Sequence, residues 1–193
     1  MKILGIVGSH KRNGNSFQMV KTAMEAVKEI EPLIEIDIIQ LADMRIESCR
    51  VCQSCRKTNL RCIIEEDDLQ MIYDRMKSAD GIMFSSPLYF PIPSKMVALM
   101  ERVVSLHWSK MEEDKNFISP LAGKPTCLFS TSAGAPVNLV LFHLIEFVTF
   151  LQMKLITMKE WPCYGVAPCA GWVDPLESAK KMGIIFAQAL KEN

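Results

Sequence analysis

Short apolar runs alternate with amphipathic stretches along the whole chain of 193 residues. Each run is a few residues long and is bounded by glycine, proline or polar residues, as strands of a buried sheet are. The runs predict five strands, namely "KILGIV" (2–7), "LIEIDIIQL" (33–41), "GIMFSSP" (81–87), "KPTCLFST" (124–131) and "KLITMKEWPCYGV" (154–166).

Helical periodicity fills the segments between these runs. After the first strand, apolar residues recur every three to four positions, at Val20, Ala23, Val27 and Ile30. Similar patterns, with an acidic start in the first case, predict helices over 65–80, 93–106, 136–153 and 174–190. Asp174 is suited to cap the last of these helices, and Pro175 to stand at its first position.

This alternation of buried strands and helices indicates a parallel sheet with helices on both faces. We therefore predict an α/β protein with a doubly wound, five-stranded parallel sheet in a single domain over residues 1–193. Ligands of such sheets bind outside the carboxyl ends of the strands. The loops after strands 1, 3 and 4 are thus the places to look for function.

Charge and hydropathy argue against several classes of partner. The 22 basic and 22 acidic residues cancel, so we expect no nucleic-acid or membrane-surface partner. The longest apolar stretch (139–151) contains His143 and Glu146, which favours a buried or interface helix over a membrane span. The apolar run at the start is too short for a signal-peptide core, and we expect a cytoplasmic protein.

The loop "GSHKRNGNS" (8–16) joins the first strand to the first helix. At a helix N-terminus, such a loop offers backbone N–H groups, hydroxyl and amide donors and cations, which together suit a phosphate. Its candidate binding residues are Ser9, Lys11, Arg12, Asn15 and Ser16. Neither the GxGxxG pattern nor a Walker lysine is present, which disfavours a dinucleotide site and a triphosphatase. The alternative is a polar turn in which Asn15 or Ser16 only caps the helix.

Two further loops follow strands 3 and 4. The segment "SSPLYFPIPS" (85–94) combines a proline-stiffened backbone with Tyr89 and Phe90, which suits the stacking of a flat ring such as a flavin. The alternative is that this loop only packs against the core. The segment "STSAGAP" (130–136) is small and polar, and Gly134 permits a close approach of backbone to a ligand.

These loops resemble those of the flavodoxin-like NAD(P)H-dependent FMN reductase family, and the resemblance covers nearly the whole chain. It rests on "GSHKRNGNS", on "ADGIMFSSPLYF" with its following helix "PSKMVALMERV", and on "LAGKP" before strand 4. It implies that the first loop holds the phosphate of FMN. It also implies further flavin contacts from Ser86, Pro87, Leu88, Tyr89, Phe90, Thr131, Ala133 and Gly134. The family's usual proline, arginine and glycine are replaced in the first loop by His10, Lys11 and Asn13.

Four of the seven cysteines lie in "CRVCQSCRKTNLRC" (49–62), within a polar loop over residues 43–66. In a reducing compartment, this number of thiols indicates metal or redox chemistry rather than disulfides. The C-x2-C-x2-C-x6-C spacing is ferredoxin-like, whereas zinc sites more often use two separate CxxC pairs or Cys/His mixtures. It favours a [4Fe–4S] cluster, whose negative charge nearby arginines and a lysine would offset, over zinc or free thiols. The ligands would be Cys49, Cys52, Cys55 and Cys62.

This cysteine segment narrows the resemblance to the iron-sulfur flavoprotein group. The resemblance implies one FMN and one [4Fe–4S] cluster per subunit in a homodimer or homotetramer, with helix 136–153 as a candidate interface. We then expect an oxidoreductase that takes single electrons from a ferredoxin-like carrier and passes them through FMN to a two-electron acceptor. The alternatives are a cluster-free NAD(P)H-dependent FMN or quinone reductase and a non-enzymatic redox sensor.

The other cysteines and histidines have plainer explanations. Cys127 falls in a buried strand and is expected in the core. Cys163 and Cys169 match no CxxC spacing, and we expect them to be unpaired structural thiols. His107 and His143 are expected to pack or cap rather than to catalyse.

Overall fold

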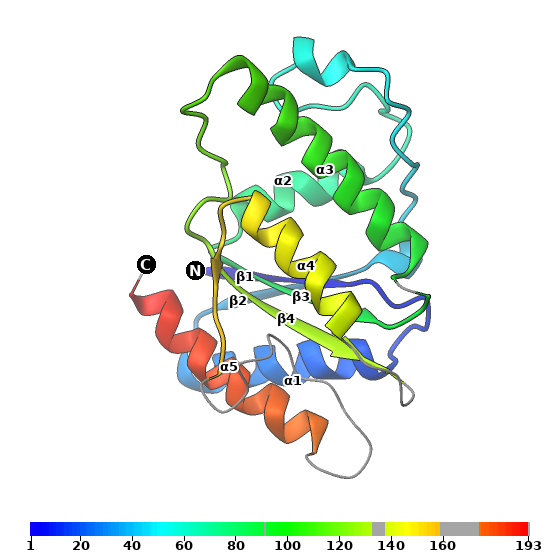
Figure 1. The fold of residues 1–193 in the computed structure, drawn as a ribbon. Coiled ribbons are helices and arrows are strands. Elements are labelled where there is room, and N and C mark those ends of the chain that lie inside the picture. The colour runs from blue at the N-terminus through cyan, green and yellow to red at the C-terminus, as the bar shows by residue number, and fades with distance from the viewer. Residues whose placement is uncertain (91, 133–137, 159–173, 193) are drawn as a thin grey trace.

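The computed structural model describes residues 1–90, 92–132, 138–158 and 174–192 (Figure 1). Within these ranges, parallel strands form one sheet in the order β2-β1-β3-β4-β5. This is the flavodoxin-like order, so the predicted doubly wound parallel sheet is confirmed. The strands are β1 (Lys2–Val7), β2 (Glu35–Gln40), β3 (Gly81–Pro87), β4 (Pro125–Thr131) and β5 (Lys154–Leu155).

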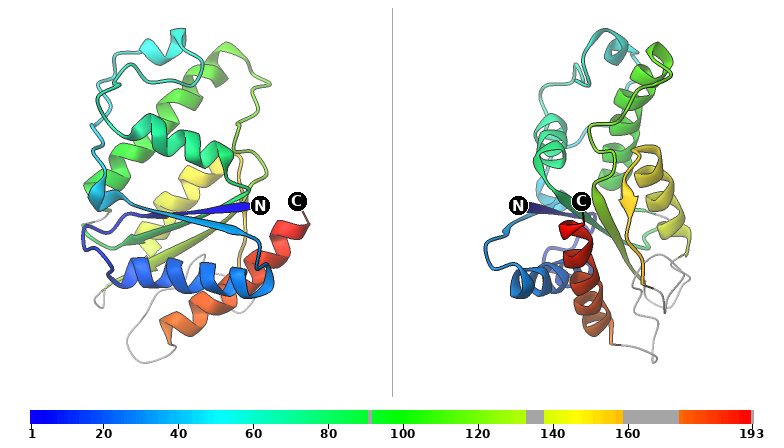
Figure 2. Two further views of the ribbon diagram at one scale, coloured as in Figure 1. Left: turned by 180° about the vertical axis from the view of Figure 1, so that it is seen from behind. Right: turned by 90° about the vertical axis from the view of Figure 1, so that its left-hand side faces the viewer.

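Helices cover both faces of the sheet (Figure 2). Alternate side chains of a strand point to opposite faces, so β1 sends Ile3 and Val7 into one core and Leu4 and Ile6 into the other. The first core is closed by α1 (Asn15–Ile30) and α5 (Pro175–Lys191). The second is closed by α2 (Leu69–Ser78), α3 (Ser94–Glu113) and α4 (Asn138–Phe150). Two short 3-10 turns, η1 (Leu41–Asp43) and η2 (Ser54–Lys57), lie between β2 and α2.

The buried strands β1 and β3 match the prediction from the sequence pattern most closely, because the ends of such strands are set by where the apolar run stops. β1 and β3 begin and end at the predicted residues, and Asp174 caps α5 by accepting a hydrogen bond from the Leu176 N–H at 2.8 Å. Three helices differ from the prediction: α2 begins only at Leu69, α3 continues to Glu113 and α4 ends at Phe150. The first two differences arise where these helices meet the cysteine loop. The predicted last strand is also shorter, because β5 ends at Leu155; residues 159–166 of that prediction lie outside the described residues, as do Cys163 and Cys169.

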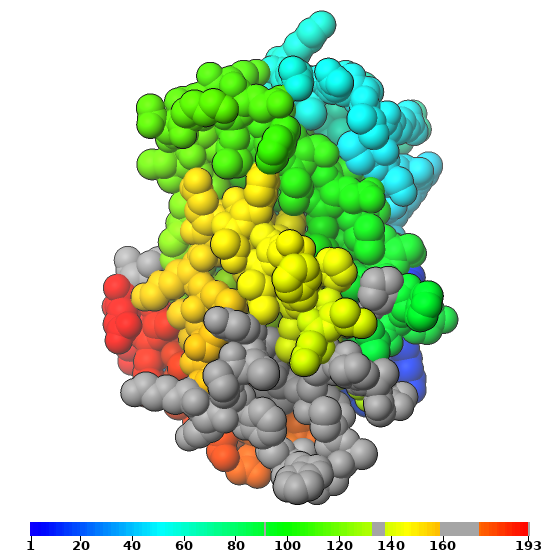
Figure 3. Space-filling model, viewed as in Figure 1, coloured from blue at the N-terminus to red at the C-terminus, as the bar shows by residue number. Residues whose placement is uncertain are grey.

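Apolar side chains of α4 face both the core and the surface. Leu144 and Val148 are fully buried, whereas Leu139 and Phe142 are each 58% exposed. Figure 3 shows this helix (yellow) on the face of the molecule beside α3 (green). No helix within the described ranges is long and apolar enough to cross a membrane.

Gly183 allows a close approach between α5 and α1. A Cβ atom placed on Gly183 would lie 2.2 Å from the carbonyl oxygen of Ala23, closer than nonbonded atoms can approach. The obstacle is the backbone of α1, which cannot rotate away as a flexible side chain can.

We predict that Gly183→Ala lowers the free energy of unfolding by about 1–3 kcal/mol. The clash outweighs the ~1 kcal/mol by which alanine normally favours a helix interior over glycine. Urea denaturation of the flavin-free protein measures the change. The exposed substitution Lys181→Ala on the same helix is the control, with an expected change below about 0.5 kcal/mol. A Gly183→Ala protein more stable than the wild type would contradict this packing.

Candidate functional site

The loops after β1, β3 and β4 meet at the carboxyl edge of the sheet, where they enclose a cavity of about 250 Å³. All three loops contribute to its wall, as the parallel direction of the strands requires. The lining residues are Ser9, Lys11, Gly14, Asn15, Ser16, Pro87, Leu88, Thr131 and Ser132. The predicted candidates Ser9, Lys11, Asn15, Ser16, Pro87, Leu88 and Thr131 are thus brought together around one cavity.

The backbone of the first loop is fixed by contacts with neighbouring strands and turns. The Gly8 N–H donates to the Ser85 carbonyl at 2.7 Å, and the Ser9 hydroxyl accepts from the Lys11 N–H at 3.1 Å. Asn13 has a φ of +53°, a conformation that asparagine tolerates, and its N–H donates to the Gln40 side chain at 3.1 Å. These hydrogen bonds define the shape of the loop.

The first turn of α1 keeps its backbone donors available. Gly14 occupies the N-cap position, and no side chain caps the helix. The alternative in which Asn15 or Ser16 serves as the cap is therefore wrong. Uncapped N–H groups at the positive end of a helix dipole, beside a cavity with a lysine, make a site for an anion such as a phosphate.

Hydrogen bonds also join the three loops to one another at the base of the cavity. The buried hydroxyls of Ser16 and Thr131 lie 3.1 Å apart, and the Leu88 N–H donates to the Thr131 carbonyl at 2.7 Å. Ser16 belongs to the first loop, Leu88 to the second and Thr131 to the third. Thr131 thus links all three walls, a role that its place in the sequence does not reveal.

The two cations of the first loop differ in their surroundings. Lys11 lines the cavity and forms no ion pair with any described residue. Arg12 is 70% exposed, pairs with Asp43 at the end of η1 and does not line the cavity. Of the two predicted cationic ligands, the structure therefore places only Lys11 at the site.

Aromatic residues of the second loop lie outside the cavity wall. Tyr89 is 70% exposed and meets His10 edge to face, with ring centroids 6.2 Å apart, and Phe90 is fully exposed. Ser86 is buried, and its hydroxyl donates to the Pro87 carbonyl at 3.2 Å. Phe90 also has a positive φ of 39°, which is unusual for a bulky residue and typical of functional loops. Ala133 and Gly134 lie outside the described residues.

The four clustered cysteines form a second site beside α3. All of them line one narrow cavity of about 30 Å³ between the loop and that helix. Cys52 is exposed, the other three are half-buried, and none forms a disulfide. No three His, Cys, Asp or Glu side chains in the described residues lie close enough to hold a metal ion together. The donor type and the shared cavity fit a group bound by four thiolates.

A polar stripe on α3 supports the cysteine loop. Arg102, Ser105 and Ser109 follow one another at intervals of three and four residues and therefore share one helix face. The Ser105 hydroxyl lies 3.6 Å from the Cys49 sulfur, and the Ser109 hydroxyl donates to the Cys55 carbonyl at 3.3 Å. None of these residues was among the candidates predicted from the sequence, although polar residues on an otherwise apolar helix face are a visible signal.

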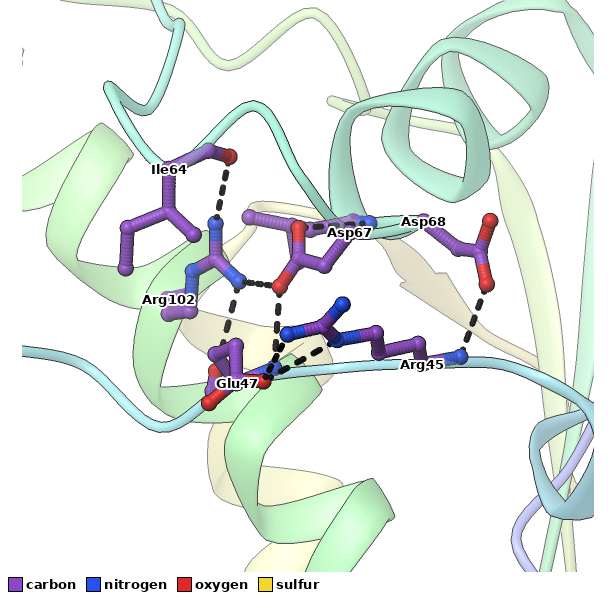
Figure 4. A network of polar contacts seen from close by, with 7 residues as sticks. Arg45, Glu47, Ile64, Asp67, Asp68 and Arg102 are labelled. Carbon is purple, nitrogen blue, oxygen red and sulfur yellow. Dashed lines mark hydrogen bonds and ion pairs between the residues drawn. The ribbon is translucent and has the colours of Figure 1, made fainter.

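A group of contacts that we call the neck closes the base of the cysteine loop (Figure 4). The Asp67 carboxylate pairs with Arg102 and also accepts from the Glu47 N–H at 2.9 Å. Next to it, the Arg45 N–H donates to the Asp68 carboxylate at 2.7 Å. Asp67 and Asp68 do stand at the start of α2: Asp68 is its N-cap residue, and the Asp67 carboxylate accepts from the Leu69 N–H at 3.3 Å. Their carboxylates also bind the incoming chain, and the helix begins at Leu69 rather than at residue 65.

The electrostatic surroundings favour negative charge in this loop. Hydrogen bonds from Ser54 lower the pKa of the exposed Cys52 thiol, and Arg50 adds a smaller effect in the same direction. Burial works against the charged form of Arg102, but its contacts with Asp67 and Cys62 raise its pKa. A positive charge is therefore kept beside the cysteine loop, and the lowered pKa of Cys52 favours the thiolate form that metal ligands take.

The other candidates behave as the sequence suggested. Cys127 is fully buried, and burial raises the pKa of its thiol, so it is an inert core residue. His107 is fully buried and bonded to Val103 and Ser119, and burial lowers its pKa. His143 is half exposed and lies 3.8 Å from Glu146 on α4.

The chain is similar to several known proteins. The chain is 35% identical over 107 residues to an iron-sulfur flavoprotein of Methanosarcina thermophila, which covers 55% of this chain and 54% of the relative. It is 38% identical over 103 residues to an iron-sulfur flavoprotein of Methanocaldococcus jannaschii, with coverages of 53% and 51%. The chain spans about half the length of the curated relatives it matches.

A solved flavodoxin from the domain Archaea has the same fold, with a TM-score of 0.60 and 16% identity over 99% of both chains. A sequence profile of the family described as "NADPH-dependent FMN reductase" matches residues 1–163. Because this match extends over far more than half of the chain, the protein belongs to the NADPH-dependent FMN reductase family.

Proposed function

We propose that this protein is a flavin-dependent oxidoreductase with two redox groups, FMN at the carboxyl edge of the sheet and a [4Fe–4S] cluster in the cysteine loop. It takes single electrons from a ferredoxin-like carrier and passes them through FMN to a two-electron acceptor. The observation that carries the proposal is that all four cysteines line one cavity, in a chain whose phosphate-type site fits the family. Two relatives are named iron-sulfur flavoproteins, which also supports the proposal.

The residues of the first site fit FMN. Lys11 and the uncapped amides of α1 would bind the phosphate, and the hydroxyls of Ser9 and Ser16 line the same wall. Pro87 and Leu88 supply an apolar side to the cavity, and the exposed ring of Tyr89 nearby offers a surface for a planar group. FMN, when bound, supplies the ability to exchange electrons both singly and in pairs.

The helix α3 connects the two sites. It begins at Ser94, just after the flavin-side loop, and reaches the cysteine loop eight residues later at Arg102, roughly 12 Å along its axis. Cys49, Cys52, Cys55 and Cys62 would hold the cluster. A homodimer or homotetramer is part of the proposal, with the exposed apolar residues of α4 as the candidate contact surface.

A second candidate function is a cluster-free FMN reductase that takes electrons from NADPH. The description of the matching family favours it. The two candidates share the flavin site and differ in the electron donor. They can therefore be separated by asking which donor reduces the bound flavin and whether the cysteines are needed.

We predict that Lys11→Ala weakens FMN binding about three- to tenfold, because the cavity loses a cation that pairs with no described carboxylate, which is worth roughly 1 kcal/mol at an exposed site. Arg12→Ala is the matched control and should change the dissociation constant less than about twofold, since Arg12 already pairs with Asp43. Quenching of FMN fluorescence during titration of the flavin-free protein measures both. An equal or larger effect of Arg12→Ala would show that the phosphate site is wrongly assigned.

We predict that Cys52→Ala abolishes the reduction of FMN by a reduced ferredoxin under anaerobic conditions. The substitution removes one of the four thiolates that would hold the cluster. Without the cluster, single electrons would have no path from the ferredoxin to FMN. Anaerobic stopped-flow absorbance of the flavin gives the rate. Cys127→Ala, the same change in the core, should keep that rate within about twofold of the wild type, because its thiol is remote from both cavities.

The same measurement decides between the two candidates. Fast reduction by NADPH in both the wild type and Cys52→Ala, with no reduction by ferredoxin in either, would refute the electron-transfer proposal and support the cluster-free reductase. Reduction by ferredoxin that survives in Cys52→Ala would show that the cysteines do not carry the electrons.

A further inference from the structure

Arg102 is an unusual residue for its position in α3. Its neighbours on the buried side of the helix are apolar, among them Leu99, Val103 and Leu106, yet Arg102 is only 1% exposed. An arginine is almost never buried to this degree unless it is paired. Removing the charge from water costs several kcal/mol, which one carboxylate only partly offsets.

The guanidinium of Arg102 holds both ends of the cysteine loop. Its Nη1 donates to the Asp67 carboxylate and to the Glu47 carbonyl at 3.2 Å, and its Nη2 donates to the Ile64 carbonyl at 3.3 Å. Glu47 precedes the first cysteine, and Ile64 and Asp67 follow the last. Figure 4 shows these contacts converging on one side chain. A planar fork with several donors can make them together, whereas a lysine ammonium cannot.

The third nitrogen of the Arg102 guanidinium, Nε, takes no part in these contacts. Among the described residues, its Nε is buried without a hydrogen-bond partner. The same side chain lines the narrow cavity that all four cysteines share, whereas Asp67 does not. A buried donor without a partner is costly and rare in proteins. A structural ion pair alone does not explain an unsatisfied N–H at the wall of a thiol-lined cavity.

We propose that Arg102 is a positioning residue of the cysteine site: it closes the neck of the loop and presents a positive charge and a free N–H donor to the sulfur ligands. The proposal rests on the proposed function, because it assumes that the thiolates hold a cluster. Hydrogen bonds and charge near the sulfurs are among the main influences on cluster potential. A cluster becomes more negative on reduction, so a nearby cation stabilises the reduced form and raises the potential.

Three variants separate the two roles. Arg102→Met removes the charge and all of the neck contacts of this side chain. Arg102→Lys keeps the charge but not the fork. Arg45→Met is the matched control, because the Arg45 side chain lies at the same neck but pairs with Glu47 in an exposed position, with relative exposures of 66% and 41%.

The first readout is hydrogen exchange of residues 45–68 in the cluster-free protein. The amides of the loop should exchange at least about tenfold faster in Arg102→Met, because opening of the neck no longer breaks a buried ion pair. Arg102→Lys should be intermediate, and Arg45→Met should match the wild type, as exposed pairs contribute little. Equal exchange in Arg102→Met and Arg45→Met would overturn the positioning role.

The second readout is the midpoint potential of the cluster in anaerobically purified protein, followed by its visible absorbance. Arg102→Met should shift the potential to more negative values, and Arg102→Lys should stay near the wild type because the charge is retained. A merely structural role would loosen the loop in both variants without this difference. An unchanged potential in Arg102→Met would overturn the donor role even if exchange is faster.

Two further outcomes are covered by this design. If Arg102→Met does not fold, the double variant Asp67→Asn/Arg102→Met replaces it, since removing both charges of a buried pair is tolerated far better than removing one. Its asparagine oxygen can still accept from the Glu47 N–H. If the wild type binds no cluster, the proposed function fails and the donor role with it, while exchange in the cluster-free variants still decides whether Arg102 closes the neck.

Discussion

The parallel direction of the strands is the constraint on which this structure depends. It brings the carboxyl ends of β1, β3 and β4 to one edge, so residues as far apart in sequence as Ser16 and Thr131 touch there. Parallel strands also require crossover connections, which supply the helices on both faces. One of these crossovers, α3, starts at the flavin-side edge and carries its polar stripe under the cysteine loop. The sheet thereby determines where both candidate redox sites lie.

The cysteine loop packs Leu60 into the core beside α2 and α3 and also makes polar contacts with α3. The buried pair of Arg102 and Asp67 closes the loop at its base, and Ser105 and Ser109 contact it further along the helix. Arg56 adds an ion pair with Glu112 on the same helix. The four thiols line one common cavity, and their binding to a metal or cluster would release protons.

Sequence patterns predicted the features that depend on local chemistry. The alternation and length of the apolar runs predicted both ends of β1 and β3, and the preference of N-caps for aspartate predicted the role of Asp174. The composition of the first loop predicted four residues that line the cavity, namely Ser9, Lys11, Asn15 and Ser16. The failures concern choices between partners that only tertiary structure reveals. Arg12 looks equivalent to Lys11 in sequence. In the structure, however, Arg12 pairs with Asp43 and does not line the cavity. Asp67 and Asp68 stand at the start of α2, as their acidic side chains suggest, but their carboxylates also hold the chain that enters the cysteine loop.

The central claim is that Cys49, Cys52, Cys55 and Cys62 hold an iron–sulfur cluster beside a flavin site. It is tested most directly by purifying the protein without oxygen and determining iron, acid-labile sulfide, zinc and FMN per chain. The account predicts about four irons, four sulfides and one FMN, as the ferredoxin-like spacing implies. Zinc without sulfide, or FMN with neither metal, would contradict it.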